Sequence, residues 1–134
     1  MPQRPDDPSI DDEERLWRRV HPTQIELNPQ TRQPDVSSGT FSTREEVSVS
    51  IASESVLADF LRDNPDHSVI EFTAGAARAL GCTVVRDPQP NDPAHALVCG
   101  TRSRGQLNKT QQELLNQAST LVVVGRIGGT AQES

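Results

Sequence analysis

Two stretches of the chain alternate between apolar and polar positions. In residues 15–20 (RLWRRV), Leu16, Arg18 and Val20 share one face, and in residues 46–52 (EVSVSIA) apolar side chains again occupy every second position. A period of two residues is typical of a β-strand with one buried face. We therefore predict strands over both segments, the second of them half-buried in an antiparallel sheet.

Shorter apolar runs predict the other strands. They read SVIEF (68–72), CTVVR (82–86), HALVCG (95–100) and TLVVVG (120–125). The last run is apolar at four successive positions, which is expected of a strand in a sheet that is covered on both faces. We therefore expect the C-terminal strand to be well buried.

Three segments have helical spacing. Residues 53–64 place Val56, Leu57, Phe60 and Leu61 inward between a capping Ser53 and a terminating Pro65. Residues 73–80 are alanine-rich and end at Gly81, and in residues 108–119 Asn108 is the expected cap, with Leu114, Leu115 and Ala118 inward. About six strands and two or three helices in irregular order predict a single small α+β domain with a mixed, mostly antiparallel sheet.

Acidic residues are concentrated at the start of the chain. Residues 1–14 hold six of the 19 acids and three of the ten prolines, but one aliphatic side chain, Ile10. Such a segment cannot bury enough apolar surface to offset the entropy lost on ordering. We expect a disordered acidic tail over residues 1–14, the α+β domain over 15–127 and a frayed end over 128–134.

The remaining composition argues against two classes of partner. Lys and Arg are not clustered and Tyr is absent, whereas nucleic-acid binders use clustered basic residues and aromatic platforms. No apolar run approaches the roughly 18–20 residues of a membrane span, and the polar start lacks the apolar stretch of a signal peptide. We expect neither nucleic acid nor membrane as a partner, a cytoplasmic location, and Cys82 and Cys99 as buried, reduced thiols.

Residues 22–43 form the longest stretch without periodicity, and Arg18 and His21 lie just before it. Its turn SSGTFS (37–42) carries four hydroxyl groups. A guanidinium can bind an anion bidentately, and hydroxyl groups beside it can orient that anion. Loops longer than about 12–15 residues are usually functional or disordered. We predict a ligand site in which Arg18 binds an anion, the hydroxyls orient it and His95 titrates; its residues are Arg18, His21, Ser38, Thr40 and His95.

Each of these features also has a simpler structural explanation. Arg18 and Arg19 could keep an edge strand soluble, with His21 ending it. Serine, glycine and threonine are common in turns, and SSGTFS lacks a recognised phosphate-binding frame. The sequence leaves both explanations open.

The sequence predicts no metal ion and no complete catalytic set. Close pairs of ligands such as C-x₂₋₄-C or H-x₃₋₅-H are absent, and Asp92 in the nearest approach, Asp92-x-x-His95, is explained as a turn former before Pro93. His95 and Cys99 share a strand face but lie roughly 13 Å apart, too far for a catalytic dyad. We expect no cofactor.

The order of the polar residues resembles that of the ADP-ribosyltransferases, in which a basic residue on an early strand precedes a serine-bearing strand and a [QE]-x-E acid. The matching positions here are Arg18 or His21, then Ser37, Ser38 or Ser48, then Gln111 and Glu113 of QQE. The resemblance implies an NAD-consuming transferase or glycohydrolase with Arg18, Ser38 and Glu113 as catalytic residues. The chain departs from the family because Glu113 falls in a predicted helix and Tyr is absent.

These patterns lead to three hypotheses on function. The first is a small, soluble, bacterial-type accessory or binding protein that acts through a protein partner or a small, nucleotide-like ligand. The second is the NAD-consuming enzyme of the resemblance. The third is a structural subunit of a larger assembly, with Trp17 at the interface if its ring is exposed. The oligomeric state stays open.

Overall fold

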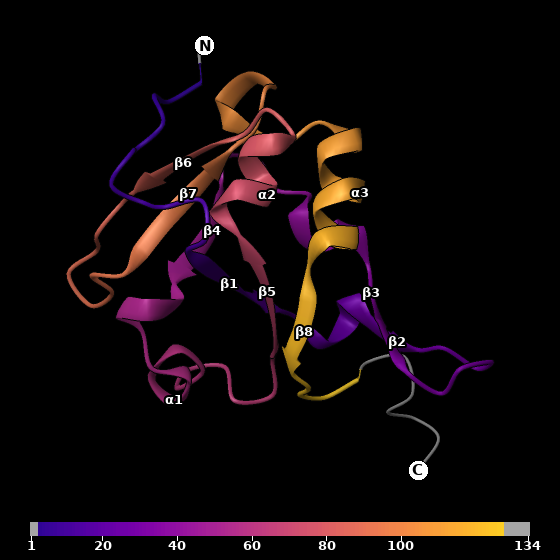
Figure 1. Ribbon diagram of the computed structural model, residues 1–134. Helices are drawn as coiled ribbons and strands as arrows, with labels where there is room; N and C mark the ends of the chain where they lie inside the picture. Colours follow the sequence, from indigo (N-terminus) through magenta and orange to yellow (C-terminus); the bar gives the residue numbers. More distant parts are fainter. Residues whose placement is uncertain (1–2, 128–134) are drawn as a thin grey trace.

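The computed structural model describes residues 3–127 and arranges them around one large sheet (Figure 1). Within that range six strands form the sheet in the order β6-β7-β4-β1-β5-β8, and every neighbouring pair is antiparallel. The strands are β1 (Arg15–Val20), β4 (Val47–Ile51), β5 (Ser68–Thr73), β6 (Thr83–Arg86), β7 (His95–Cys99) and β8 (Thr120–Val123). The predicted α+β class with a mostly antiparallel sheet is confirmed.

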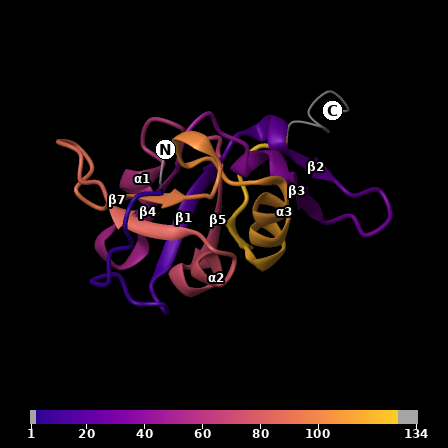
Figure 2. The ribbon, with the colours of Figure 1, turned by 90° about the horizontal axis from the view of Figure 1, so that it is seen from above.

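The described chain contains three α-helices, α1 (Leu57–Phe60), α2 (Ala74–Ala79) and α3 (Lys109–Ala118). Figure 2 shows α2 and α3 beside each other on one side of the sheet. Two of the predicted caps are present: Gly81 follows α2 with φ 89°, and the Asn108 side chain accepts a hydrogen bond from the Gln111 amide at 2.8 Å. Ser53 does not cap α1, whose N-cap is Val56. Asn108 and Gln111 form a reciprocal capping box, which fixes where α3 begins.

One face of the sheet carries the hydrophobic core. The alternation in β1 sends Leu16 and Val20 to this face, where both are fully buried, and α2 and α3 add Ala77 and Leu115. Phe41 packs edge-to-face on Phe72 with ring centroids 5.6 Å apart. The opposite face carries Trp17 and Arg19, and Phe60 of α1 covers part of it.

The segment predicted to be irregular, residues 22–43, contains a small β-hairpin. β2 (Ile25–Leu27) pairs antiparallel with β3 (Pro34–Val36), and the hairpin projects from the domain in Figure 1. A 3₁₀ helix, Ser38–Phe41, follows, and the Ser37 side chain caps it by accepting from the Gly39 amide. The three-residue strands are too short for a visible period, but the buried Ile25 and Phe41 anchor both ends.

The disorder expected for residues 1–14 is not confirmed. The structure places residues 3–14 against the sheet, with the Asp7 amide donating to the Val84 carbonyl at 2.9 Å and Ile10 buried in the core. The Arg78 guanidinium contacts Asp6 and Asp12 at 3.0 and 2.7 Å. Pairing with this arginine and one aliphatic anchor hold a segment whose composition predicts disorder. The predicted frayed end, residues 128–134, lies outside the described residues.

Three predictions of burial are wrong. The helix predicted over 53–64 is reduced to the four residues of α1, and Val56 is 61% exposed. In α3 the buried positions are Gln111 and Leu115, while Leu114 is 41% exposed and Ala118 is exposed. β8 lies at the sheet edge, paired with β5 alone within residues 3–127, and Val122 is exposed, so the sheet is not covered on both faces at this strand.

The two cysteines are free and buried, as predicted. Cys99 pairs in register with Thr83, so Cys82 and Cys99 lie on or next to neighbouring strands. Burial raises the pKa of the Cys82 thiol to about 12, and the charge of Cys99 adds to the effect. Both thiols are therefore protonated and poorly reactive near neutral pH.

Candidate functional site

Arg18 lies in a gap between β1 and β4. Pairing of these strands ends after Trp17↔Ser50, although both strands continue. The Arg18 guanidinium reaches into the gap, where Nε donates to the Thr40 carbonyl at 3.0 Å and Nη1 donates to the Ser48 carbonyl at 2.8 Å. The side chain thus donates to two backbone carbonyls. One of them, the Ser48 carbonyl, belongs to the part of β4 that no longer pairs with β1.

The charge of Arg18 is not neutralised by a carboxylate. Its side chain is half-buried, and within residues 3–127 it makes no ion pair. Burial and, to a smaller extent, the neighbouring Arg19 charge lower the pKa of Arg18 to about 10. An unpaired cation in a partly buried position is unfavourable, so an anion that reaches this guanidinium would be stabilised.

A small cavity of about 40 Å³ opens beside this guanidinium. Arg18 of β1, Ser48 of β4 and His95 of β7 contribute to its wall. Arg19, Phe60 and Asp92 line both this cavity and a larger groove of about 550 Å³. The two spaces share these residues and so form one recess. Arg19 and Phe60 place it on the face of the sheet opposite α2 and α3, and Arg18, although it shares the core-side parity of Leu16 and Val20, lines it at the gap between β1 and β4.

His95 presents a defined ring nitrogen to the cavity. Its Nδ1 lies 3.0 Å from the Asp87 carbonyl oxygen and 3.1 Å from the Asp87 carboxylate, and both of these groups are acceptors. The proton of the neutral ring therefore resides on Nδ1, which leaves Nε2 as an acceptor. The His95 side chain is 18% exposed and lines the cavity.

Phe60 and Arg19 form the floor shared by cavity and groove. Arg19 Nη1 donates to the Phe60 carbonyl at 2.9 Å, and its guanidinium lies 4.6 Å from the Phe60 ring centroid. The Trp17 ring contacts Phe60 at 5.9 Å, and its indole N–H donates to Glu71 at 3.1 Å. These contacts attach α1 to the sheet although the helix has only four residues, and so they hold Phe60 in the floor.

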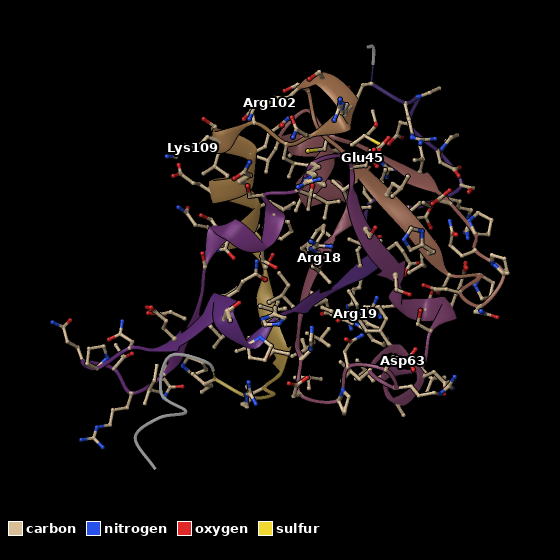
Figure 3. The ribbon with its side chains drawn as sticks, turned by 180° about the vertical axis from the view of Figure 1, so that it is seen from behind. Arg18, Arg19, Glu45, Asp63, Arg102 and Lys109 are labelled. Carbon is tan, nitrogen blue, oxygen red and sulfur yellow. The ribbon has the colours of Figure 1, made fainter. Side chains whose placement is uncertain are left out.

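Carboxylates dominate the outer part of the groove. Glu54 pairs with Arg86 at 3.0 Å, and Asp59 pairs with Arg62. The Asp63 and Asp92 side chains, by contrast, make no hydrogen bond or ion pair within the described part of the chain. Figure 3 shows Asp63 close to Arg19, so positive and negative groups face the same groove. The recess is therefore cationic at its inner end and acidic at its outer end.

The residues predicted for the ligand site are only partly brought together. Arg18 and His95 line the same cavity, and Thr40 contributes its carbonyl oxygen to Arg18, while its buried Oγ1 has no hydrogen-bond partner among residues 3–127. Ser38 lies one residue beyond Ser37 in the 3₁₀ helix and lines neither cavity nor groove. His21 lies beyond the end of β1, next to His67. The binding role of all five residues stays a prediction.

The structure bears on one of the simpler explanations and on the hypothesis of an interface at Trp17. The explanation of Arg18 and Arg19 as edge-strand charges is wrong, because β1 is an inner strand between β4 and β5. Trp17 is half-buried against Phe60 and is not the exposed indole that an interface through β1 requires.

Sequence reasoning missed the outer half of the groove. Arg19, Arg62 and Asp63 carry no motif, and Asp92 was assigned only to a turn. Residues 54–63 and 91–94 meet only because β4 and β7 pair in the sheet. The weak signal was the density of charged residues in 53–63 around a single aromatic.

Comparison with known proteins finds no matching family model, no matching curated protein and no matching solved structure. Among residues 3–127, no helix has the length and apolar character required to cross a membrane.

Proposed function

We propose that this chain is a small binding protein whose ligand occupies the recess between β1, β4, β7 and α1. The observation that carries the proposal is the half-buried guanidinium of Arg18, which lines the recess without a carboxylate partner. Its Nη2 group donates to no acceptor of the described chain, while Nε and Nη1 are held by carbonyls. The fixed orientation of the guanidinium reduces the entropy lost when an anion binds.

The inner cavity fits one compact anionic group. A volume of about 40 Å³ has room for a carboxylate but not for a chain of phosphates. Arg18 and Arg19 both line this cavity and supply positive charge, and the free edge of the Arg18 guanidinium can donate to an anion. A carboxylate is the anion that these groups match best.

The outer groove favours a positively charged group on the same ligand. Four carboxylates and two guanidinium groups line it, and two of the carboxylates, Asp63 and Asp92, have no partner side chain in the described part of the chain. The volume of about 550 Å³ falls in the range of small-molecule sites. The ligand we propose is therefore a small zwitterion, such as an amino acid or a short peptide, rather than a nucleotide.

The transferase alternative has no support in this geometry. Glu113 is exposed on α3, which packs on the core face of the sheet, whereas the recess containing Arg18 opens on the other face. Phe60 already contacts Trp17 and Arg19, so its ring is occupied by protein neighbours. We do not propose NAD as a cofactor.

The test is a titration of the full chain followed by amide shifts in nuclear magnetic resonance spectra. The probes are free amino acids, glycylglycine, acetate, inorganic phosphate and NAD⁺. We expect zwitterions to shift amides of residues 18–19, 48–50 and 92–95, with Arg18→Gln weakening binding about tenfold. Asp63→Asn should weaken binding of zwitterions but not of acetate.

Arg102→Gln is the matched control, because Arg102 is exposed and lies well away from Arg18 in Figure 3. This variant should bind like the natural chain. The proposal fails if no zwitterion shifts these amides at millimolar concentration, or if Arg18→Gln binds as tightly as the natural chain. Binding of NAD⁺ or phosphate in place of zwitterions would refute the ligand class.

A further inference from the structure

Two histidines lie opposite each other at the end of the β1–β5 pair. The last pair in register is Val20↔Ser68, and the next positions along both strands are His21 and His67. Their rings lie with centroids 5.1 Å apart and planes at 82°. Neither ring belongs to the recess described above.

Each ring has its Nδ1 engaged by a neighbouring group. His67 Nδ1 lies 3.1 Å from the Asp66 carboxylate, which accepts, so this Nδ1 carries the proton and Nε2 keeps its lone pair. His21 Nδ1 lies 2.8 Å from Thr23 Oγ1 and can donate to that hydroxyl. In the alternative tautomer the same nitrogen accepts from the Thr23 amide at 3.1 Å.

We propose that His21 and His67 bind one divalent late first-row metal ion, of the Zn²⁺ class, through their two Nε2 atoms. Imidazole nitrogens bind such ions at about 2.0–2.1 Å, and two rings around one tetrahedral ion then have centroids roughly 5 Å apart. The observed centroid separation of 5.1 Å agrees with this value. Binding selects the His21 tautomer that donates from Nδ1 to Thr23.

The surroundings of the pair support this assignment. A carboxylate that accepts from the second nitrogen of a ligating imidazole is a common feature of metal sites, because it orients the ring and raises its basicity. Asp66 occupies this position toward His67. His21 is exposed, and 17% of the His67 side chain is exposed, so an ion can reach the rings from solvent.

Water must complete the coordination. No group of three or more histidine, cysteine or acidic side chains within residues 3–127 is placed to hold a metal. The site would therefore have two protein ligands and open positions, which is typical of an exchangeable ion rather than a structural one. The sequence predicted no metal site here, because the two proposed ligands are distant in sequence and meet only through strand pairing.

The test is calorimetric titration of the full chain with ZnCl₂ near neutral pH, repeated for His21→Gln and His67→Gln. We expect one ion per natural chain and a loss of affinity of at least about tenfold in each variant. His95→Gln is the matched control, because His95 also has a carboxylate at Nδ1 but no second imidazole beside it. This control should bind like the natural chain.

A second readout identifies the ligands directly. Electron paramagnetic resonance of the Cu²⁺-loaded chain should show two coordinated nitrogens, and Asp66→Asn should weaken Zn²⁺ binding about tenfold while leaving that spectrum intact. The proposal is overturned if the natural chain takes up no Zn²⁺, if either histidine variant binds as well as the natural chain, or if His95→Gln shows the same loss.

Discussion

Arg18 donates a hydrogen bond to the Ser48 carbonyl at 2.8 Å, across the gap where β1 and β4 stop pairing. A second bond, to the Thr40 carbonyl at 3.0 Å, connects the same guanidinium to the 3₁₀ helix over the core face. One side chain therefore joins two strands and a loop, and its free edge faces the recess. Structure and proposed binding depend on the same group.

Removal of this guanidinium should destabilise the fold. Arg18→Met leaves both carbonyls without their charged donor, so we expect the free energy of unfolding to fall by about 1–3 kcal/mol. Urea unfolding followed by circular dichroism measures the difference. Arg102→Met, at an exposed position, should change stability by less than about 0.5 kcal/mol. If Arg18→Met is as stable as the natural chain, the two bonds contribute nothing to the fold.

Arg78 should control the order of the N-terminal segment. It binds the carboxylates of Asp6 and Asp12 and the carbonyl of Asp7. We expect Arg78→Met to raise amide hydrogen exchange over residues 6–12, because three of the contacts that hold this segment on the domain are lost. Arg62→Met removes an ion pair elsewhere on the surface and should leave that exchange unchanged. Unchanged exchange in Arg78→Met would contradict the role of Arg78.

Gln111 should contribute more to stability than is usual for a glutamine side chain, because it is buried. Only 3% of it is exposed; its Oε1 accepts from the Asn108 amide at 2.9 Å and its Nε2 donates to the Leu80 carbonyl at 3.0 Å. Gln111→Leu keeps the volume but leaves these groups unpaired, so thermal or urea unfolding should show a loss of about 1–3 kcal/mol. Gln117→Leu, on the exposed side of α3, is the control. Equal stability of the two variants would disprove this prediction.

Stability should depend on the charge of Glu46 in acid. Arg4 donates to the Glu46 carboxylate at 2.6 Å, and this hydrogen bond holds the pKa of Glu46 below its ordinary value of 4.5. Because the folded pKa is lowered, the pair stabilises the protein fully above pH 4.5, and the contribution is lost as pH falls through the folded pKa. The pair is partly exposed, so the contribution is below about 1 kcal/mol.

Glu46→Gln should therefore be less stable than the natural chain at pH 7, and the difference should shrink as pH is lowered below 4.5. Urea unfolding at a series of pH values measures it. Glu45→Gln, whose exposed side chain makes no ion pair within the described chain, is the control. A difference for Glu46→Gln that stays constant down to pH 3 would count against the hydrogen bond as its cause.

Local pattern was sufficient for most elements of the fold. The period of two in residues 15–20 and 46–52 corresponds to β1 and β4, and Asn108 caps α3 where predicted. These features depend on neighbours a few residues apart, which the sequence displays directly. Burial was predicted less well, as Leu114 shows, because the exposed face of a helix depends on what packs against it.

The candidate site was only partly predictable for a related reason. Arg18 and His95 were selected for their chemistry, but Arg19, Phe60 and Asp63 were not, since they join the recess only when β1, β4 and β7 pair. His21 was assigned to the wrong neighbourhood, because its partner His67 belongs to a strand that pairs with β1 from the other side.

The sequence by itself determined the six strands of the main sheet, where α2 ends and α3 begins, and that one α+β core forms, but not the β2–β3 hairpin or the short extent of α1. Only the tertiary structure decided that β1 lies inside the sheet, that β8 lies at its edge, and that residues 3–14 pack on the domain. The physical reason is that periodicity and caps are interactions between near neighbours. Strand order and ion pairs join residues far apart, whose free energies depend on the whole arrangement.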